Sequence, residues 1–272
     1  MEELKKPELV DICAQDLCKA FKLSPRWLPL ARIPAARFAK VLLAFDDRLA
    51  RDGIVAAGQF LVDHFTGGVK VNGREHLPQT GPLIIASNHP GMADAMALWQ
   101  AVGRKDLKVI AAERDLLKLL PNVSRSLIIS QPESTQAIRL SLDHLRSGGA
   151  LLTFPAGKIE PDPSIRPGGY ESIEAWSTSP AALAAKVEGT VLAAALVAGV
   201  ISGPAASSLL VRKFKNQKDR DWAGATLQIL LPWYRHVKVT VDFGLPLDEA
   251  QSDLKSAMRH LLETYDARKA VR

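Results

Sequence analysis

A histidine and an aspartate five positions apart are the residues of this 272-residue chain whose types and spacing best suggest chemistry. They are His89 and Asp94, in the segment Asn-His-Pro-Gly-Met-Ala-Asp (residues 88–94). On one continuous helix they would face different sides, because about 3.6 residues make a turn. If His89 lies in a loop and Asp94 in the first helical turn, the carboxylate can reach the imidazole. It then fixes the ring tautomer and leaves the other nitrogen free to accept a proton.

A histidine held in this way is suited to act as a general base toward a hydroxyl group. Such a base typically contributes roughly 10²–10⁴-fold to a reaction rate. The start of the following helix adds backbone N–H groups, which bind a phosphate or a developing oxyanion. The same pair of residues also fits a histidine that only caps a helix, so the spacing alone leaves catalysis and capping both open.

Short apolar runs alternate with helical patterns around this segment. Residues 83–86 are expected to form a buried strand that feeds the loop at His89, and Pro90 suits a first helical position. Further strands are expected at residues 69–73, 108–112, 127–129, 150–154, 191–200 and 237–243. Further helices are expected at residues 133–147, 179–188 and 247–268. This alternation predicts an α/β fold with a mixed central sheet flanked by helices, preceded by an N-terminal helical segment.

The N-terminal helical segment is assigned to residues 1–66, and an α/β domain to residues 67–272. Prolines punctuate the segment, and Trp27 and several basic residues lie among its apolar positions. This pattern is typical of a helix in a lipid interface, but it also fits a helix packed on the main domain with its charges in water. Cys13 and Cys18 are too few for a disulfide scaffold and lack metal-ligand spacing, so no metal site is expected.

The net charge of +6 favours an anionic partner, such as an acidic lipid surface or a phosphorylated substrate. No nucleic-acid-binding motif is recognisable, so a nucleic-acid partner is not expected. The charged run at residues 213–221 predicts an exposed loop, or a lip that meets anionic head groups. Residues 189–211 carry no charge, but glycine, serine and proline interrupt them. They predict a buried strand followed by a loop rather than a membrane span.

Three pieces of the chain together resemble the start of the glycerolipid acyltransferase family, which includes lysophosphatidic acid and glycerol-3-phosphate acyltransferases. They are residues 74–78 (Arg-Glu-His-Leu-Pro), residues 81–89, and Asp94, and the resemblance extends over roughly residues 65–245. The family's Asn-His-x-x-x-x-Asp motif is matched in full. The resemblance implies that His89 is the general base and that Asp94 orients it. It also implies an acyl thioester of coenzyme A or acyl carrier protein as co-substrate, with no metal or redox cofactor.

The third family motif, Phe-Pro-Glu-Gly-Thr-Arg, is altered to Phe-Pro-Ala-Gly-Lys-Ile at residues 154–159. The Glu and Arg of that motif are associated with a phosphorylated acceptor, so their loss weakens the expectation of a glycerol-phosphate-type acceptor. Lys158 is expected either to hold a phosphate or carboxylate as a point charge or to be a solvated loop residue, and Arg166 to reach toward the site. With Trp176 downstream, this version resembles a divergent haemolysin-annotated branch, some of whose members are linked to N-acylated amino-acid lipids.

His89 and Asp94 are therefore the expected catalytic residues. Contact with the substrate is expected from Asn88, Gly91, Phe154, Pro155, Gly157, Lys158 and Arg166. The implied reaction moves a fatty acyl group from the thioester to a lipid or lipid-precursor acceptor at an anionic membrane surface, with the protein cytoplasmic and peripheral on the inner face of the membrane. Two alternatives stay open: an N-acyltransferase that makes amino-acid-type lipids, and a non-catalytic lipid-binding protein on the same fold.

Overall fold

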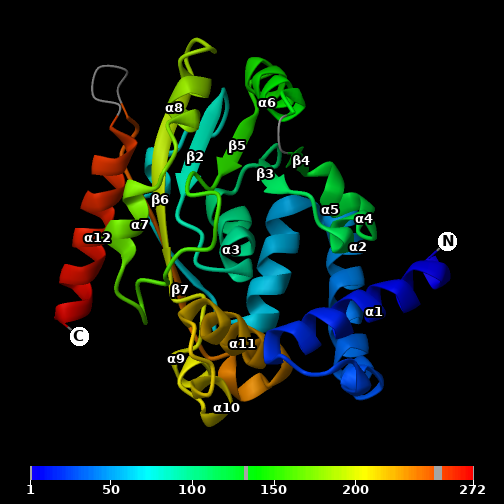
Figure 1. The fold of residues 1–272 in the computed structure, drawn as a ribbon. Coiled ribbons are helices and arrows are strands. Elements are labelled where there is room, and N and C mark those ends of the chain that lie inside the picture. Colours follow the sequence, from blue (N-terminus) through cyan, green and yellow to red (C-terminus); the bar gives the residue numbers. More distant parts are fainter. Residues whose placement is uncertain (1, 132–133, 248–252, 272) are drawn as a thin grey trace.

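A seven-stranded mixed sheet forms the centre of the computed structural model, which describes residues 2–131, 134–247 and 253–271. The strands are β1 (Val69–Asn72), β2 (Leu83–Ser87), β3 (Lys108–Ala112), β4 (Leu127–Ser130), β5 (Ala150–Thr153), β6 (Val191–Ala198) and β7 (Val239–Phe243). Their order is β1-β7-β6-β2-β5-β3-β4, and only the β6–β7 pair is antiparallel. Helices lie on both sides of this sheet (Figure 1). The predicted α/β class, with a mixed sheet and an N-terminal helical segment, is confirmed.

The central strands are apolar along their whole length because both faces of the sheet are covered. Every residue of β2 is buried. Leu83 and Ile85 face the cluster that includes the long N-terminal helices, whereas Ile84 and Ala86 face the cluster that includes the C-terminal helix. Alternate residues of one strand thus belong to two different cores, and the strand cannot be moved by one position without disturbing both.

Helices α1 (Glu2–Phe21) and α2 (Leu28–Phe65), joined through the 3-10 turn η1 (Pro25–Trp27), form the N-terminal segment. The long helix α2 is interrupted at Gly53, whose φ is +84°. At Gly58 it crosses helix α3 (Met92–Val102) so closely that a Cβ there would lie 2.8 Å from the Met96 carbonyl oxygen. Because α2 shares the core of the sheet, the division between residues 1–66 and 67–272 stays a prediction.

The remaining helices flank the sheet or connect its strands. They are η2 (Arg74–His76), α4 (Asp115–Lys118), α5 (Pro121–Arg125), α6 (Gln136–Arg146), α7 (Gly169–Glu174), α8 (Ser179–Ala184), α9 (Gly203–Ala206), α10 (Leu209–Arg212), α11 (Gln217–Leu230), η3 (Pro232–Tyr234) and α12 (Leu254–Ala270). The expected helices at residues 133–147 and 247–268 correspond to α6 and α12, and the predicted parts at residues 133 and 248–252 lie outside the described residues.

Two expectations about loops are wrong. The charged run at residues 213–221 is not a loop throughout, because α11 begins at Gln217 and the Asn216 side chain accepts a hydrogen bond from the Lys218 N–H. A side-chain cap of this kind lets a helix start within a polar stretch. The segment after β6 forms the short helices α9 and α10 rather than an open loop. Among the described residues, no helix combines the length and the apolar character that crossing a bilayer requires.

Candidate active site

The carboxyl ends of three neighbouring parallel strands, β6, β2 and β5, meet at one edge of the sheet and carry the candidate site. Ligand sites of α/β sheets commonly lie at this edge. The chain continues from β2 into Asn88 and His89, from β5 into Phe154, and from β6 into Gly199. The sheet thereby brings together segments that lie far apart in the sequence.

Asn88 fixes the loop that carries His89. Its side chain is buried, and its Nδ2 donates to the Val197 carbonyl at 2.8 Å, while the Val197 N–H donates to its Oδ1 at 2.7 Å. The backbone of β6 therefore satisfies both the donor and the acceptor of the side-chain amide, much as a neighbouring strand would. This arrangement does not support the expected contact of Asn88 with substrate and gives the residue a positioning role.

His89 and Asp94 have the loop-and-first-turn geometry expected from their spacing. His89 Nδ1 lies 2.8 Å from Asp94 Oδ2, and Asp94 is fully buried at the start of α3. The same Oδ2 accepts the Gly91 N–H at 2.9 Å, so Gly91 holds the carboxylate as well as bordering the cavity described below. His89 Nε2 makes no hydrogen bond within the described part of the chain, and it is the ring nitrogen left for a substrate.

The surroundings of His89 favour its protonated form. Burial alone would lower the pKa of His89, but the charge and hydrogen bond of Asp94, together with the charge of Glu160, raise it above the ordinary value, while Arg114 acts in the opposite direction. The Phe154 ring stacks on the imidazole with centroids 4.3 Å apart. The ring of His89 is thus fixed on one side by a carboxylate and on one face by an aromatic group.

Glu160 is a buried residue of the site that the sequence motifs did not predict. Its Oε2 accepts the His89 N–H at 2.8 Å, and its own N–H donates to the His89 carbonyl at 2.8 Å. Its Oε1 accepts the Ser172 hydroxyl and the Trp176 Nε1–H, both at 2.9 Å. Burial raises the pKa of Glu160, although these hydrogen bonds act in the other direction. The only sequence signal was a pair of acids between prolines, Glu-Pro-Asp-Pro at residues 160–163.

Asp162, the second acid of that pair, ties the same segment to the end of β6. Its buried carboxylate accepts four backbone N–H groups at 2.8–3.0 Å. They belong to Ser164, Gly199, Val200 and Ile201. The loops after β5 and β6 are therefore joined through one side chain.

The other expected substrate contacts divide into two groups. Pro155 is buried and follows Phe154 directly. Gly157 has a φ of +62° and closes a tight turn, in which its N–H donates to the Phe154 carbonyl. Lys158 is exposed and forms no hydrogen bond or ion pair with the residues that the structure describes. Arg166 does not support the expected reach into the site, because its Nε pairs with Asp221 of α11 at 3.1 Å.

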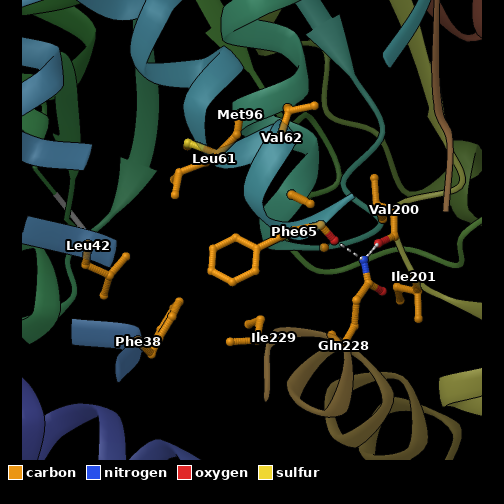
Figure 2. A pocket seen from close by; sticks show the side chains of 13 residues that line it. Phe38, Leu42, Leu61, Val62, Phe65, Met96, Val200, Ile201, Gln228 and Ile229 are labelled. Carbon is orange, nitrogen blue, oxygen red and sulfur yellow. Dashed lines mark hydrogen bonds between the residues drawn. The ribbon is translucent and has the colours of Figure 1, made fainter. Parts of the chain in front are cut away.

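An apolar cavity begins beside the His89 loop, at Gly91 and Ala93, and is partly open to solvent. Figure 2 shows side chains from α2, α3 and α11 around it, including Phe38, Met96 and Ile229. Gln228 is the only polar side chain in its described lining. Its oxygen accepts the Ser202 N–H, and its nitrogen donates to the Phe65 and Val200 carbonyls, so its polar ends are satisfied. The cavity thus suits a hydrocarbon chain.

No group of three or more His, Cys, Asp or Glu side chains within residues 2–131, 134–247 and 253–271 is arranged to hold a metal ion. Cys13 and Cys18 are both free and buried in α1, and burial raises the pKa of the Cys13 thiol to about 12. A thiol of this kind is a small apolar core residue rather than a nucleophile.

The substitution Asp94→Asn should lower the pKa of His89, because it removes the nearest negative charge while burial continues to oppose protonation. A titration of the imidazole by NMR would measure this change. The matched control is Asp143→Asn, on the exposed side of α6, which should leave the His89 pKa unchanged. An unchanged pKa in the Asp94→Asn variant would contradict the pairing of the two residues.

The substitution Glu160→Gln should destabilise the loop that carries His89. An amide has a single oxygen, so either the His89 N–H or the Ser172 and Trp176 donors would face an NH₂ group. A buried donor left without a partner costs about 1–3 kcal/mol, which urea unfolding would detect. The neighbouring exposed change Glu171→Gln is the control. Equal unfolding free energies for the two variants would refute the structural role of Glu160.

Part of the chain, including this site, is similar to a known family of proteins. A family model described as Acyltransferase matches residues 68–197. A similar solved structure is the crystal structure of the 1-acyl-sn-glycerophosphate (LPA) acyltransferase PlsC from Thermotoga maritima, with 17% identity over 98% of this chain and 94% of that chain. Its TM-score of 0.44 is too low to transfer fold or function, and no curated protein matches the chain. The matched residues include the loops that carry His89, Asp94 and Phe154, so the resemblance to an acyltransferase family expected from the sequence is confirmed for this part of the chain.

Proposed function

We propose that the protein transfers a fatty acyl group from an acyl thioester to a lipid or lipid-precursor acceptor. The observation that carries this proposal is the position of His89. Its Nδ1 is held by the buried Asp94, its Nε2 is free, and an apolar cavity begins at Gly91, two residues further along the chain. A base of this kind beside a site for a hydrocarbon chain matches the needs of acyl transfer from a thioester to a hydroxyl or amine.

In the proposed reaction, His89 Nε2 removes the proton from the acceptor as its oxygen or nitrogen attacks the thioester carbonyl carbon. The carbon–sulfur bond breaks, and the imidazolium gives its proton to the departing thiolate, which leaves as a thiol. Asp94 takes no proton; it keeps the tautomer fixed and stabilises the imidazolium. Backbone N–H groups near the start of α3 are the candidates for stabilising the oxyanion.

The apolar cavity that begins at Gly91 and Ala93 is proposed to hold the acyl chain of the donor. The donor is a thioester of coenzyme A or of acyl carrier protein, and no further cofactor is proposed. On the acceptor side, the family's Glu and Arg are replaced by Ala156 and Ile159, while Lys158 is exposed and unpaired in the described residues. We therefore place a phosphate or carboxylate of the acceptor at Lys158, and Phe154, Pro155 and Gly157 shape the turn that presents it.

The protein is proposed to work as a peripheral protein on the cytoplasmic face of the membrane, where its lipid acceptor resides. Support comes from the connection between α1 and α2 and from the first turns of α2. Trp27, Leu30 and Ile33 are exposed there, and the basic Arg26 and Arg37 lie close by in sequence and are also exposed. Exposed apolar side chains among cations are typical of helices in a lipid interface.

Replacing the base, His89→Ala, should reduce kcat by roughly 10²–10⁴-fold while the protein stays folded. The assay offers a labelled acyl thioester to lysophosphatidate, glycerol phosphate and amino-acid acceptors, with circular dichroism as the folding control. Because only neutral His89 accepts a proton and its pKa is raised, wild-type kcat/KM should fall as the pH drops through that pKa. Acylation of the amine acceptors alone would identify the N-acyltransferase alternative. Absence of acylation with retained lipid binding would favour the non-catalytic scaffold.

The substitution Ala225→Phe should shift the preference toward shorter acyl chains, because a phenyl ring would fill part of the cavity that Ala225 lines. The expected change is a fall of about tenfold or more in kcat/KM for long-chain relative to short-chain thioesters, as steric exclusion from a packed apolar site predicts. Thr226→Phe, on the adjacent position of α11 outside the lining, is the matched control. The same chain-length profile in both variants would remove the acyl chain from this cavity.

A further inference from the structure

We propose that residues 209–215 form a second membrane-docking surface, which binds the head groups and outer acyl region of an anionic bilayer. This 209–215 surface consists of Leu209, Leu210, Arg212, Lys213 and Lys215. The proposal rests on the proposed function for its lipid substrate, but it concerns a different part of the chain from the α1–α2 connection. Binding to vesicles tests it without turnover.

Buried neighbours in the sequence keep the two leucines of the 209–215 surface exposed. Leu209 is 84% exposed and Leu210 56% exposed, while the next residue, Val211, is completely buried. Val211 and Phe214 pack against residues of α9 and α11 in a small apolar cluster of their own. Since Val211 and Phe214 fix α10 in place, the exposure of the leucines is a feature of the folded surface and not of a loose end.

The charges around these leucines select an anionic partner. Arg212, Lys213, Lys215 and Lys218 are all exposed, and residues 209–218 contain no acidic residue. The nearest acid along the chain, Asp219, is already paired with Lys22 at 2.5 Å. Apolar side chains between cations are suited to a bilayer surface, where leucines enter the acyl boundary and cations meet phosphates.

The 209–215 surface adjoins the N-terminal segment. The Lys22–Asp219 ion pair joins the residue after α1 to the first turn of α11, and Phe21 packs on the cluster that holds Val211 and Phe214. Figure 1 shows α9, α10 and α11 together at the lower end of the molecule, beside the end of α1. The exposed Trp27 follows six residues after Phe21, so the two proposed contacts lie on neighbouring parts of the surface.

Helix α11 connects this surface with the cavity. Trp222, Ala225 and Ile229 are spaced three and four residues apart and therefore share one face of the helix. Ala225 and Ile229 line the cavity, whereas Trp222 is exposed nearer to the start of the helix. A bilayer docked at residues 209–215 would thus lie close to the apolar route toward His89.

The experiment compares binding of the 272-residue chain to vesicles of phosphatidylcholine with and without phosphatidylglycerol. The double variant L209S/L210S should bind anionic vesicles about tenfold more weakly or worse, as expected when two interfacial leucines are lost. The matched control is I138S/L140S on α6, where the two side chains are 52% and 40% exposed at the opposite end of the molecule in Figure 1. It should bind like the wild type.

A charge variant, K213E/K215E, should lose the preference for phosphatidylglycerol, because the attraction between lysines and anionic lipids is removed. Thermal unfolding checks that each variant is folded. If folded L209S/L210S binds vesicles as well as the wild type does, the proposal is overturned. It is also overturned if this variant changes its mass in sedimentation while its vesicle binding stays the same, because the two leucines would then form a contact between copies of the chain. If L209S/L210S loses vesicle binding and the wild type transfers no acyl group, the docking surface is upheld and the proposed function is rejected.

Discussion

The structure of the site depends on the burial of one charged group, the carboxylate of Asp94. A carboxylate without solvent is tolerated only if hydrogen-bond donors surround it. Asp94 lies at the start of α3, where backbone N–H groups are unpaired, and it accepts from Gly91 and Ala95 as well as from His89. The loop before α3 must therefore fold back toward this carboxylate, and that fold leaves Nε2 of His89 free.

The same solution recurs twice in the neighbouring loops. Glu160 and Asp162 are also buried acids, and their partners are backbone N–H groups and the side chains of Ser172 and Trp176. Irregular backbone at the ends of strands needs such partners, because it has no sheet or helix ladder of its own. Three buried carboxylates thus hold the loops after β2, β5 and β6 together around His89.

The apolar half of the site has a different origin. It is built by α2, α3 and α11, which come from three distant parts of the chain. The close crossing at Gly58 sets the distance between α2 and α3, and Gln228 joins α11 to the ends of α2 and β6. The helix that carries Asp94 is therefore fixed by the same packing that forms the apolar cavity. The polar groups around His89 and the apolar cavity therefore lie side by side.

The sequence by itself determined the strand and helix pattern, the mixed α/β class and the His89–Asp94 pair, because hydrophobic periodicity and motif spacing are local properties. The same pair also carries much of the resemblance to an acyltransferase family. It did not identify Glu160, Asp162 or the cavity, and it assigned Asn88 and Arg166 to the substrate although β6 and Asp221 occupy them. Those features depend on contacts between residues up to 163 positions apart. Only tertiary packing decides which polar atom is already satisfied and which, like Nε2 of His89, remains free to react.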